Sequence, residues 1–370
     1  MSQRADSAVL PIILLCFAST AAHAEDAAPG FQHRIYEGLP TSMTQSSRSH
    51  LNDVTKASLS VATMRPFYII VQHSRRWTPG NTLTIAFNGG TDDLYAKIEG
   101  AASPWTQSNA ANLKFSFKDN SGQYRHWSAS DQNYAADIRI GFINQGDYAG
   151  NWSAVGTDSR DSTVEGGAPN QGSMNFGGFD QQLPVDWAGT VLHEFGHALG
   201  FEHEHQSPSG GCDFRLDDDP GYVKTTDAEG WYTTDSKGRR PGLYTYLGGK
   251  ANYWPKDRVD ANLKAFSSAA TRNYLLGPFD KLSIMKYYFE PAMFEKGLNS
   301  SCYTGTENET LSAQDLIGVQ KAYPRDPAAA QRITTEQTEA LRALINVPFV
   351  PDTLKSGLNQ RLNVIMMRED

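Results

Sequence analysis

The sequence contains the stretch His193-Glu194-Phe195-Gly196-His197-Ala198-Leu199-Gly200-Phe201-Glu202-His203, which has the pattern H-E-x-x-H-x-x-G-x-x-H. Residues four apart share one face of a helix, so His193 and His197 can bind one metal ion, with Glu194 beside the first ligand. Glycine readily adopts the left-handed conformation that ends helices, so Gly200 lets the chain turn and bring in His203. Three protein ligands with open positions for water and substrate are typical of catalytic zinc.

The length of this pattern makes an accidental match rare. A bare H-E-x-x-H occurs by chance in helices, whereas the full pattern fixes five residue types in eleven positions. With this composition, a chance match is on the order of one in ten thousand or rarer. The motif therefore predicts one zinc ion held by His193, His197 and His203. The alternative is a decayed site that keeps the pattern without the activity.

A second motif lies downstream, where Ser283-Ile284-Met285-Lys286-Tyr287 reads S-x-M-x-Y. Together with a glutamate, Glu204, directly after the third histidine, this resembles the metzincin zinc endopeptidases, and most of all the astacin family. The resemblance implies that Met285 forms the floor of the site. It also implies that Tyr287 is a fifth ligand or moves to stabilise the transition state. An isolated S-x-M-x-Y would more simply be a turn in the core.

The resemblance covers roughly residues 76–325 and departs from the animal astacin pattern in two places. The run His205-Gln206-Ser207-Pro208 stands where astacins usually carry arginine and aspartate. Upstream, Tyr36-Glu37-Gly38-Leu39 is the nearest approach to the F-x-G-D latency motif, and it has no aspartate. The family's latency mechanism, and a role for Glu204 in binding a freed N-terminus, are therefore not carried over.

Hydrophobic periodicity predicts an α+β fold. Alternating runs predict strands, and helices are expected after the cap Thr91, around the zinc motif and near the end of the similar region. The predicted strands are Thr82–Phe87, Leu113–Phe117, Asp137–Phe142 and Ser173–Phe176, and the later helices cover about 185–199 and 311–323. By resemblance, a mixed twisted sheet and two long helices lie above the cleft of a two-lobed domain, with an irregular lower lobe. Ser173, Met174, Asn175 and Phe176 would then form the edge strand to which substrate adds, or an edge lined by a loop.

The ends of the chain suggest export. Residues 1–24 read as a secretory signal, with Arg4, an apolar run and the cleavage site Ala22-His23-Ala24. Residues 25–72 are expected to be a polar extension or short pro-segment, which ends in the β-prone Phe67–Gln72. Residues 73–325 are expected to form the catalytic domain, and residues 326–370 a mainly helical tail. We expect a soluble protein that is secreted or periplasmic.

The net charge restricts the classes of binding partner, and the cysteine content predicts a disulfide. The net charge of -8 gives no electrostatic case for nucleic acid or anionic membranes, and we expect a monomer acting on polypeptides. Signal removal would take Cys16 and leave Cys212 and Cys302, which read as one disulfide. Asp217-Asp218-Asp219 is either a calcium ligand set or, more simply, a solvated acidic loop.

The sequence thus predicts a secreted metalloendopeptidase in which Glu194 is the general base that activates water at zinc. No serine or cysteine nucleophile stands with a base at a recognisable spacing, so no covalent intermediate is expected. The alternative is an inactive metal-containing protein that binds an extracellular polymer. The retained Glu194 argues against it, because a structural metal needs no base.

Overall fold

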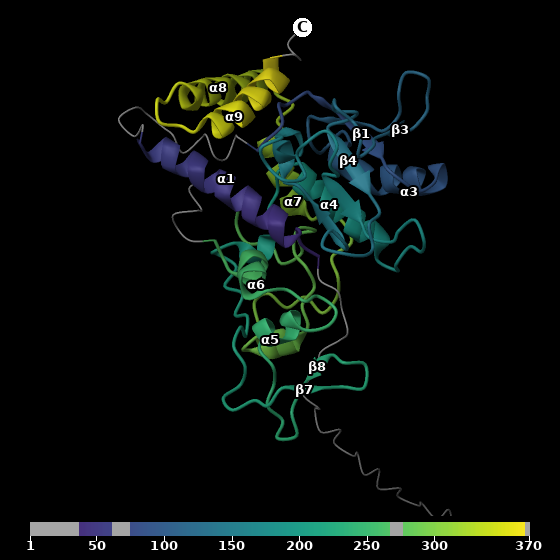
Figure 1. Cartoon of the computed structure of the whole chain (residues 1–370), viewed down its shortest axis with the longest axis vertical. Helices are drawn as coiled ribbons and strands as arrows, with labels where there is room; N and C mark the ends of the chain where they lie inside the picture. Colours follow the sequence, from purple (N-terminus) through teal and green to yellow (C-terminus); the bar gives the residue numbers. More distant parts are fainter. Residues whose placement is uncertain (1–36, 61–74, 267–276, 367–370) are drawn as a thin grey trace, which may run out of the picture.

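The computed structural model describes residues 37–60, 75–266 and 277–366 (Figure 1). It contains a mixed sheet with several helices, as the α+β prediction requires. The signal sequence, Cys16 and the β-prone Phe67–Gln72 lie outside the described residues. The two-lobed arrangement stays a prediction.

The larger sheet has the strand order β2-β1-β4-β6-β5, with β3 also pairing with β1. The strands are β1 (Thr82–Phe87), β2 (Lys114–Ser116), β3 (Arg125–His126), β4 (Ile138–Gly141), β5 (Asn151–Ser153) and β6 (Met174–Phe176). All pairs are parallel except β5 with β6, which is antiparallel. Every residue of β4 and β6 is buried, as expected for strands in the middle of a sheet that is covered on both faces.

The prediction that Ser173–Phe176 is the edge strand was wrong. The strand in this stretch, β6, lies between β4 and β5, and the strand at the end of the sheet is β5. The error arose because the order of strands along the chain does not give their order in space. The three residues of β5 are too few to show a period-2 pattern, yet they return beside β6 and cover it.

Two long helices pack beside this sheet. In α3 (Asp92–Ala102) the Thr91 side chain accepts a hydrogen bond from the Leu94 amide, as the cap prediction required. The helix of the zinc motif, α4 (Trp187–Ala198), is held by two buried tryptophans. Trp105 Nε1 donates to the Leu192 carbonyl at 2.7 Å, and Trp77 Nε1 to the Ala198 carbonyl at 2.8 Å. These bonds fix both the middle and the end of α4.

The N-terminal and C-terminal helices pack together, although they are far apart in the sequence (Figure 1). They are α1 (Thr41–Ser60), α8 (Pro327–Ile345) and α9 (Asp352–Met366). Val54 of α1 is buried in an apolar cluster with Leu341 and Leu344 of α8 and Leu358 of α9. The polar sequence of α1 has no strong period and did not predict a helix, so its packing on the other elements explains its stability.

A buried charge cluster connects the same helices to Arg75 and to the loop that carries Asp158 and Asp161. In α9, Arg361 donates to Asp158 at 2.7 Å and pairs with Asp161 at 2.9 Å, and Arg75 pairs with Asp158 at 2.9 Å. His50 of α1 lies against Arg361 at 3.2 Å. Burial, followed by the charge of Arg361, lowers the pKa of His50 to about 4, so the neutral ring accepts from the guanidinium.

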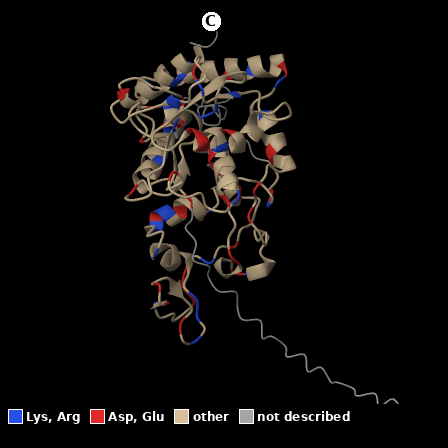
Figure 2. Ribbon diagram, turned by 90° about the vertical axis from the view of Figure 1, so that its right-hand side faces the viewer, with Lys and Arg blue, Asp and Glu red and all other residues tan. Residues whose placement is uncertain are grey.

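Residues between α4 and α7 (Ala313–Ala322) form mostly short elements around a second apolar cluster. These elements are β7 (Thr225–Thr226), β8 (Tyr232–Thr233), α5 (Leu243–Gly248) and α6 (Lys256–Leu263). The expected disulfide between Cys212 and Cys302 is present, with their Cα atoms 5.2 Å apart. Acidic and basic residues are interspersed along the ribbon (Figure 2). In the part of the chain that the structure describes, no helix is long and apolar enough to cross a membrane.

Candidate metal centre

The three histidines of the motif meet at one point. His193 and His197 lie on α4, and Gly200 follows the helix with φ +94°. The Gly200 amide bonds to the His197 carbonyl at 2.7 Å and the Phe201 amide to the Gly196 carbonyl at 3.1 Å, the two bonds of a Schellman cap. The chain then brings His203 back. The His197 Nε2 atom lies 3.1 Å from that of His193 and 3.0 Å from that of His203.

The other ring nitrogen of each histidine fixes the tautomer. His193 Nδ1 donates to the Ile284 carbonyl and His197 Nδ1 to the Phe201 carbonyl, both at 2.7 Å. His203 Nδ1 lies 3.2 Å from Gln206 Oε1. Carbonyl oxygens only accept, so the protons are on Nδ1 and the Nε2 lone pairs face one another.

This geometry fits a bound cation. Burial lowers the pKa of His193 to about 4 and of His197 to about 3, and the pKa of His203 also falls well below its ordinary value. Neutral imidazole is the form that binds metal. Tetrahedral zinc with bonds of about 2.0–2.1 Å would separate its nitrogens by about 3.3 Å, close to the distances here. The three Nε2 atoms can therefore hold a metal ion.

Two further polar groups at this point, a carboxylate and a hydroxyl, have no hydrogen-bond partner among the described residues. The carboxylate is that of Glu194, with both oxygens unpartnered, and the hydroxyl is that of Tyr287. Both side chains are buried, and burial raises their pKa values well above the ordinary ones. The Tyr287 ring stacks on His193, with centroids 4.9 Å apart. Buried polar groups are almost always satisfied, so these atoms indicate a place for a ligand or water.

The contact between α4 and Met285 depends on a glycine inside the motif. A Cβ atom at Gly196 would overlap Met285 Sδ and lie 2.9 Å from the Trp105 ring. Met285 therefore packs directly against the backbone of α4, between the two helical ligands. The pattern H-E-x-x-H places no requirement on this position, so sequence reasoning missed Gly196.

An N-terminal segment that the motif analysis did not assign to the site reaches it as well. One oxygen of Glu37, one oxygen of Glu194 and one ring nitrogen of His193 all lie within 4.8 Å of one another. The next residue, Gly38, donates its amide to the Asn151 carbonyl on β5 at 3.3 Å. Its carbonyl accepts from Arg258 Nη2 at 2.8 Å. The run Tyr36-Glu37-Gly38-Leu39 was the nearest approach in the sequence to the F-x-G-D motif, but its lack of an aspartate kept Glu37 out of the predicted site.

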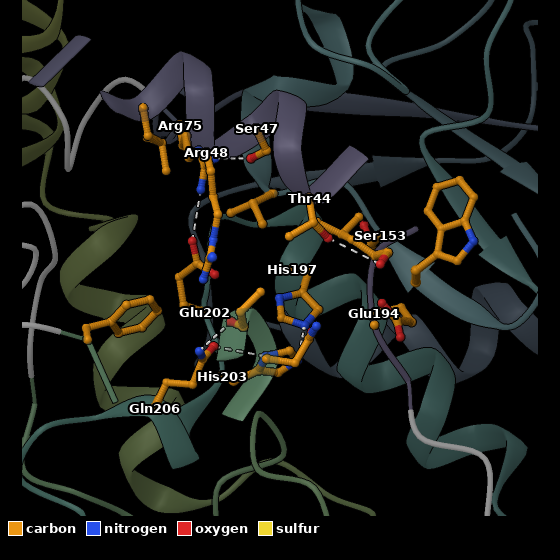
Figure 3. Close-up of a pocket in the computed structure, with 18 of the residues that line it drawn as sticks. Thr44, Ser47, Arg48, Arg75, Ser153, Glu194, His197, Glu202, His203 and Gln206 are labelled. Atoms are coloured by element: carbon orange, nitrogen blue, oxygen red, sulfur yellow. Dashed lines mark hydrogen bonds and ion pairs between the residues drawn. The ribbon is translucent and has the colours of Figure 1, made fainter. Parts of the chain in front are cut away.

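Helix α1, which follows this segment, also lies beside the site. Thr44, Ser47 and Arg48 line the same pocket as Glu194, His197 and His203 (Figure 3). The pocket thus has His197, His203 and Glu194 on one side and the first turns of α1 on the other.

Other predicted site residues lie elsewhere. Asn175 of β6 is occupied within the fold, because its amide bonds to the Ile143 backbone and to the Gly150 carbonyl. In the acidic run, Asp218 accepts from the Gly242 amide and Asp219 pairs with Arg240. Among the described residues, the carboxylate oxygens of this run do not come together with enough other ligand atoms to form a candidate metal site.

The solved structures that are similar to this chain include two of myroilysin. The first is 31% identical with a TM-score of 0.47, covering 68% of this chain and 97% of that chain. The second is 28% identical with a TM-score of 0.41, covering 68% of this chain and 87% of that chain. No protein-family model and no curated protein matches the chain. The candidate site therefore rests on its own geometry.

Replacing Gly196 by alanine tests the packing of Met285. Alanine favours a helix over glycine by about 1 kcal/mol, but overpacking a core typically costs about 1–3 kcal/mol. We expect Gly196→Ala to lower the free energy of unfolding by up to about 2 kcal/mol in denaturant titration. Gly189→Ala in the same helix is the control, because its Cβ would make only ordinary contact, 3.4 Å from Glu309. Equal stability of the two variants would contradict the packing role.

Proposed function

We propose that this protein is an exported zinc-dependent endopeptidase that hydrolyses peptide bonds within polypeptides. The observation that carries the proposal is the meeting of three neutral imidazoles beside the buried, unpartnered carboxylate of Glu194. The resemblance of both motifs to those of astacins favours zinc and peptide substrates. The Cys212–Cys302 disulfide supports export to an oxidising compartment, with residues 1–24 as the signal.

Each residue has a distinct role in this reaction. A zinc ion held by His193, His197 and His203 would supply a Lewis acid, which lowers the pKa of bound water towards about 7 and polarises a carbonyl. Glu194 takes the proton of the attacking water and passes it to the leaving amine. The Tyr287 hydroxyl, which has no hydrogen-bond partner among the described residues, donates to the oxyanion. Met285 supports the histidines from below.

The rival proposal is a binding protein with a structural metal. A structural zinc site is normally closed by four protein ligands, whereas three histidines converge here. A buried glutamate without a hydrogen bond also costs stability, which a structural site would have no reason to retain. Both observations favour catalysis.

The Glu194→Gln variant tests the proposal most directly. Glutamine keeps the size of the side chain but cannot accept the proton, so zinc content should stay at one ion per chain while cleavage of a denatured protein substrate is lost. Glu339→Gln, at an exposed position of α8, is the control and should retain full activity. A Glu194→Gln variant that keeps more than a small fraction of the turnover would refute the assignment.

Tyr287→Phe tests the oxyanion role. The substitution keeps the ring that stacks on His193 and removes only the hydroxyl. We expect kcat to fall by about 10²-fold with little change in KM, because the interaction forms late in the reaction. Steady-state kinetics and zinc content should be measured together. Unchanged kcat at normal zinc content would show that the hydroxyl has no part in catalysis.

We further infer that residues 25–72 act as a pro-segment, whose described part, residues 37–60, covers the site. Two observations within this range support the inference. Gly38 bonds both to the edge strand β5 and to Arg258, and α1 lines the pocket that contains Glu194. A substrate needs the edge strand and the space beside Glu194, so it competes with this segment.

A substitution at Gly38 tests the cover. A Cβ there would lie 2.9 Å from Asn262 Oδ1 and 3.2 Å from the Trp254 ring, so Gly38→Val should weaken the hold of the segment. Each 1.4 kcal/mol lost should raise kcat/KM for a short fluorogenic peptide about tenfold, until the site is fully open. Gly277→Val is the control, because a Cβ there meets nothing within 4 Å. Lower or unchanged kcat/KM in Gly38→Val would contradict the cover.

A further inference from the structure

The first turn of α7 carries a buried carboxylate that contacts the turn containing Met285. Asp315 is 9% exposed and accepts from Ser283 Oγ at 2.6 Å and from the Ile284 amide at 2.9 Å. It also accepts from the Ser312 amide at 2.9 Å, as part of the capping box of α7. Burial raises the pKa of Asp315, whereas these three hydrogen bonds lower it, because the ionised carboxylate is the form that can only accept.

These bonds continue to a metal-binding histidine. His193 Nδ1 donates to the Ile284 carbonyl at 2.7 Å. The same peptide group carries the Met285 amide, which donates to Ser283 Oγ at 3.0 Å. Ser283 Oγ in turn donates to Asp315 Oδ1. We call this chain of hydrogen bonds a relay; it runs from His193 through the Ile284–Met285 peptide and Ser283 to Asp315. Each donor in the relay points towards the carboxylate.

Such an alignment has a physical consequence. Hydrogen bonds in a chain with one direction polarise one another, so the charge of Asp315 makes the Ile284 carbonyl a stronger acceptor. A stronger bond at Nδ1 holds the imidazole ring in place and makes Nε2 a better ligand, as carboxylates do when they contact a metal-binding histidine directly. Here a hydroxyl and a peptide group stand between the carboxylate and the ring.

The other two histidines have different support. His197 bonds to the Phe201 carbonyl within its own turn, and His203 lies against Gln206. Gln206 is held by the Ala261 and Lys264 carbonyls, so its partners are neutral. Among the three, His193 is the one whose hydrogen bonds with the described residues lead to a carboxylate on another helix.

We propose that Asp315 is a positioning residue for His193, acting through Ser283 and the Ile284–Met285 peptide to orient the ring and strengthen metal binding at Nε2. The inference rests on the metal site of the proposed function but does not require that the protein be a peptidase. It makes α7 part of the support of the metal centre, in addition to its packing in the core.

The test measures zinc affinity of the full exported chain by competition with a chromophoric chelator. We expect Asp315→Asn and Ser283→Ala each to weaken zinc binding by about 10- to 100-fold, the usual effect of losing the partner of a metal-binding histidine. Because both break one relay, the double variant should lose no more than Asp315→Asn alone. The visible spectrum of the cobalt-substituted protein should shift in the same variants.

Ser312→Ala is the matched control. It removes the hydroxyl that accepts from the Asp315 amide in the capping box and leaves the bond from Ser283 to Asp315 in place. It should lower thermal stability without changing zinc affinity or the cobalt spectrum. If Asp315→Asn does not fold, Ser283→Ala, which deletes one atom, provides the measurement.

The outcomes separate the two proposals. Equal zinc affinity in the wild type, Asp315→Asn and Ser283→Ala would overturn the relay. Equal weakening in Ser312→Ala would also overturn it, because the loss would then come from the stability of α7. A chain that binds zinc with the expected pattern but cleaves no polypeptide, even when Gly38→Val loosens the cover, would retain the relay and refute the peptidase.

Discussion

The left-handed turn at Gly200 is the constraint on which the metal centre depends. With φ +94°, this residue closes α4 with two hydrogen bonds and sends the chain back, so that His203 meets the two helical histidines. A side chain there would be strained and would approach the Arg75 carbonyl at 3.4 Å. The end of α4 is itself fixed by Trp77, so the position of the third ligand is set by the core.

The loop that follows Gly200 also connects the metal centre to the buried charge cluster. Glu202, directly before His203, accepts from Arg75 at 2.9 Å, and Arg75 also pairs with Asp158. Asp158 is bonded in turn to Arg361 of α9. A buried charge that loses its partner is strongly destabilising, so these side chains hold one another in a single arrangement. The loop carrying His203 is therefore held from both sides, by Gly200 and by Arg75.

The sequence predicted those parts of the structure in which neighbouring residues determine the conformation. The strand Thr82–Phe87, the cap at Thr91, the helix of the motif and the convergence of His193, His197 and His203 all follow from local spacing or propensity. The disulfide followed from the number of cysteines. The interior place of β6 did not follow, because strand order depends on contacts between distant segments.

Other features were beyond sequence reasoning for the same reason. Helix α1 has a polar sequence, and it is stabilised by contacts of residues such as Met43 and Val54 with distant parts of the chain. Glu37 is far from the motif in sequence but adjacent to Glu194 in space. The capping box predicts the start of α7, yet it does not reveal that Asp315 also binds the turn before Met285.

The packing of α1 on α8 and α9 gives these two C-terminal helices a thermodynamic role. Val54 and Leu51 contact the apolar side of α8 and α9, and separating them would expose that surface to water at about 25 cal/mol per Å². Arg361 and His50 would also lose their contact. If α1 covers the pocket as proposed, the apolar residues of α8 and α9 would set how readily α1 detaches. Substitutions in these two helices would then adjust access to the pocket without any change near the histidines.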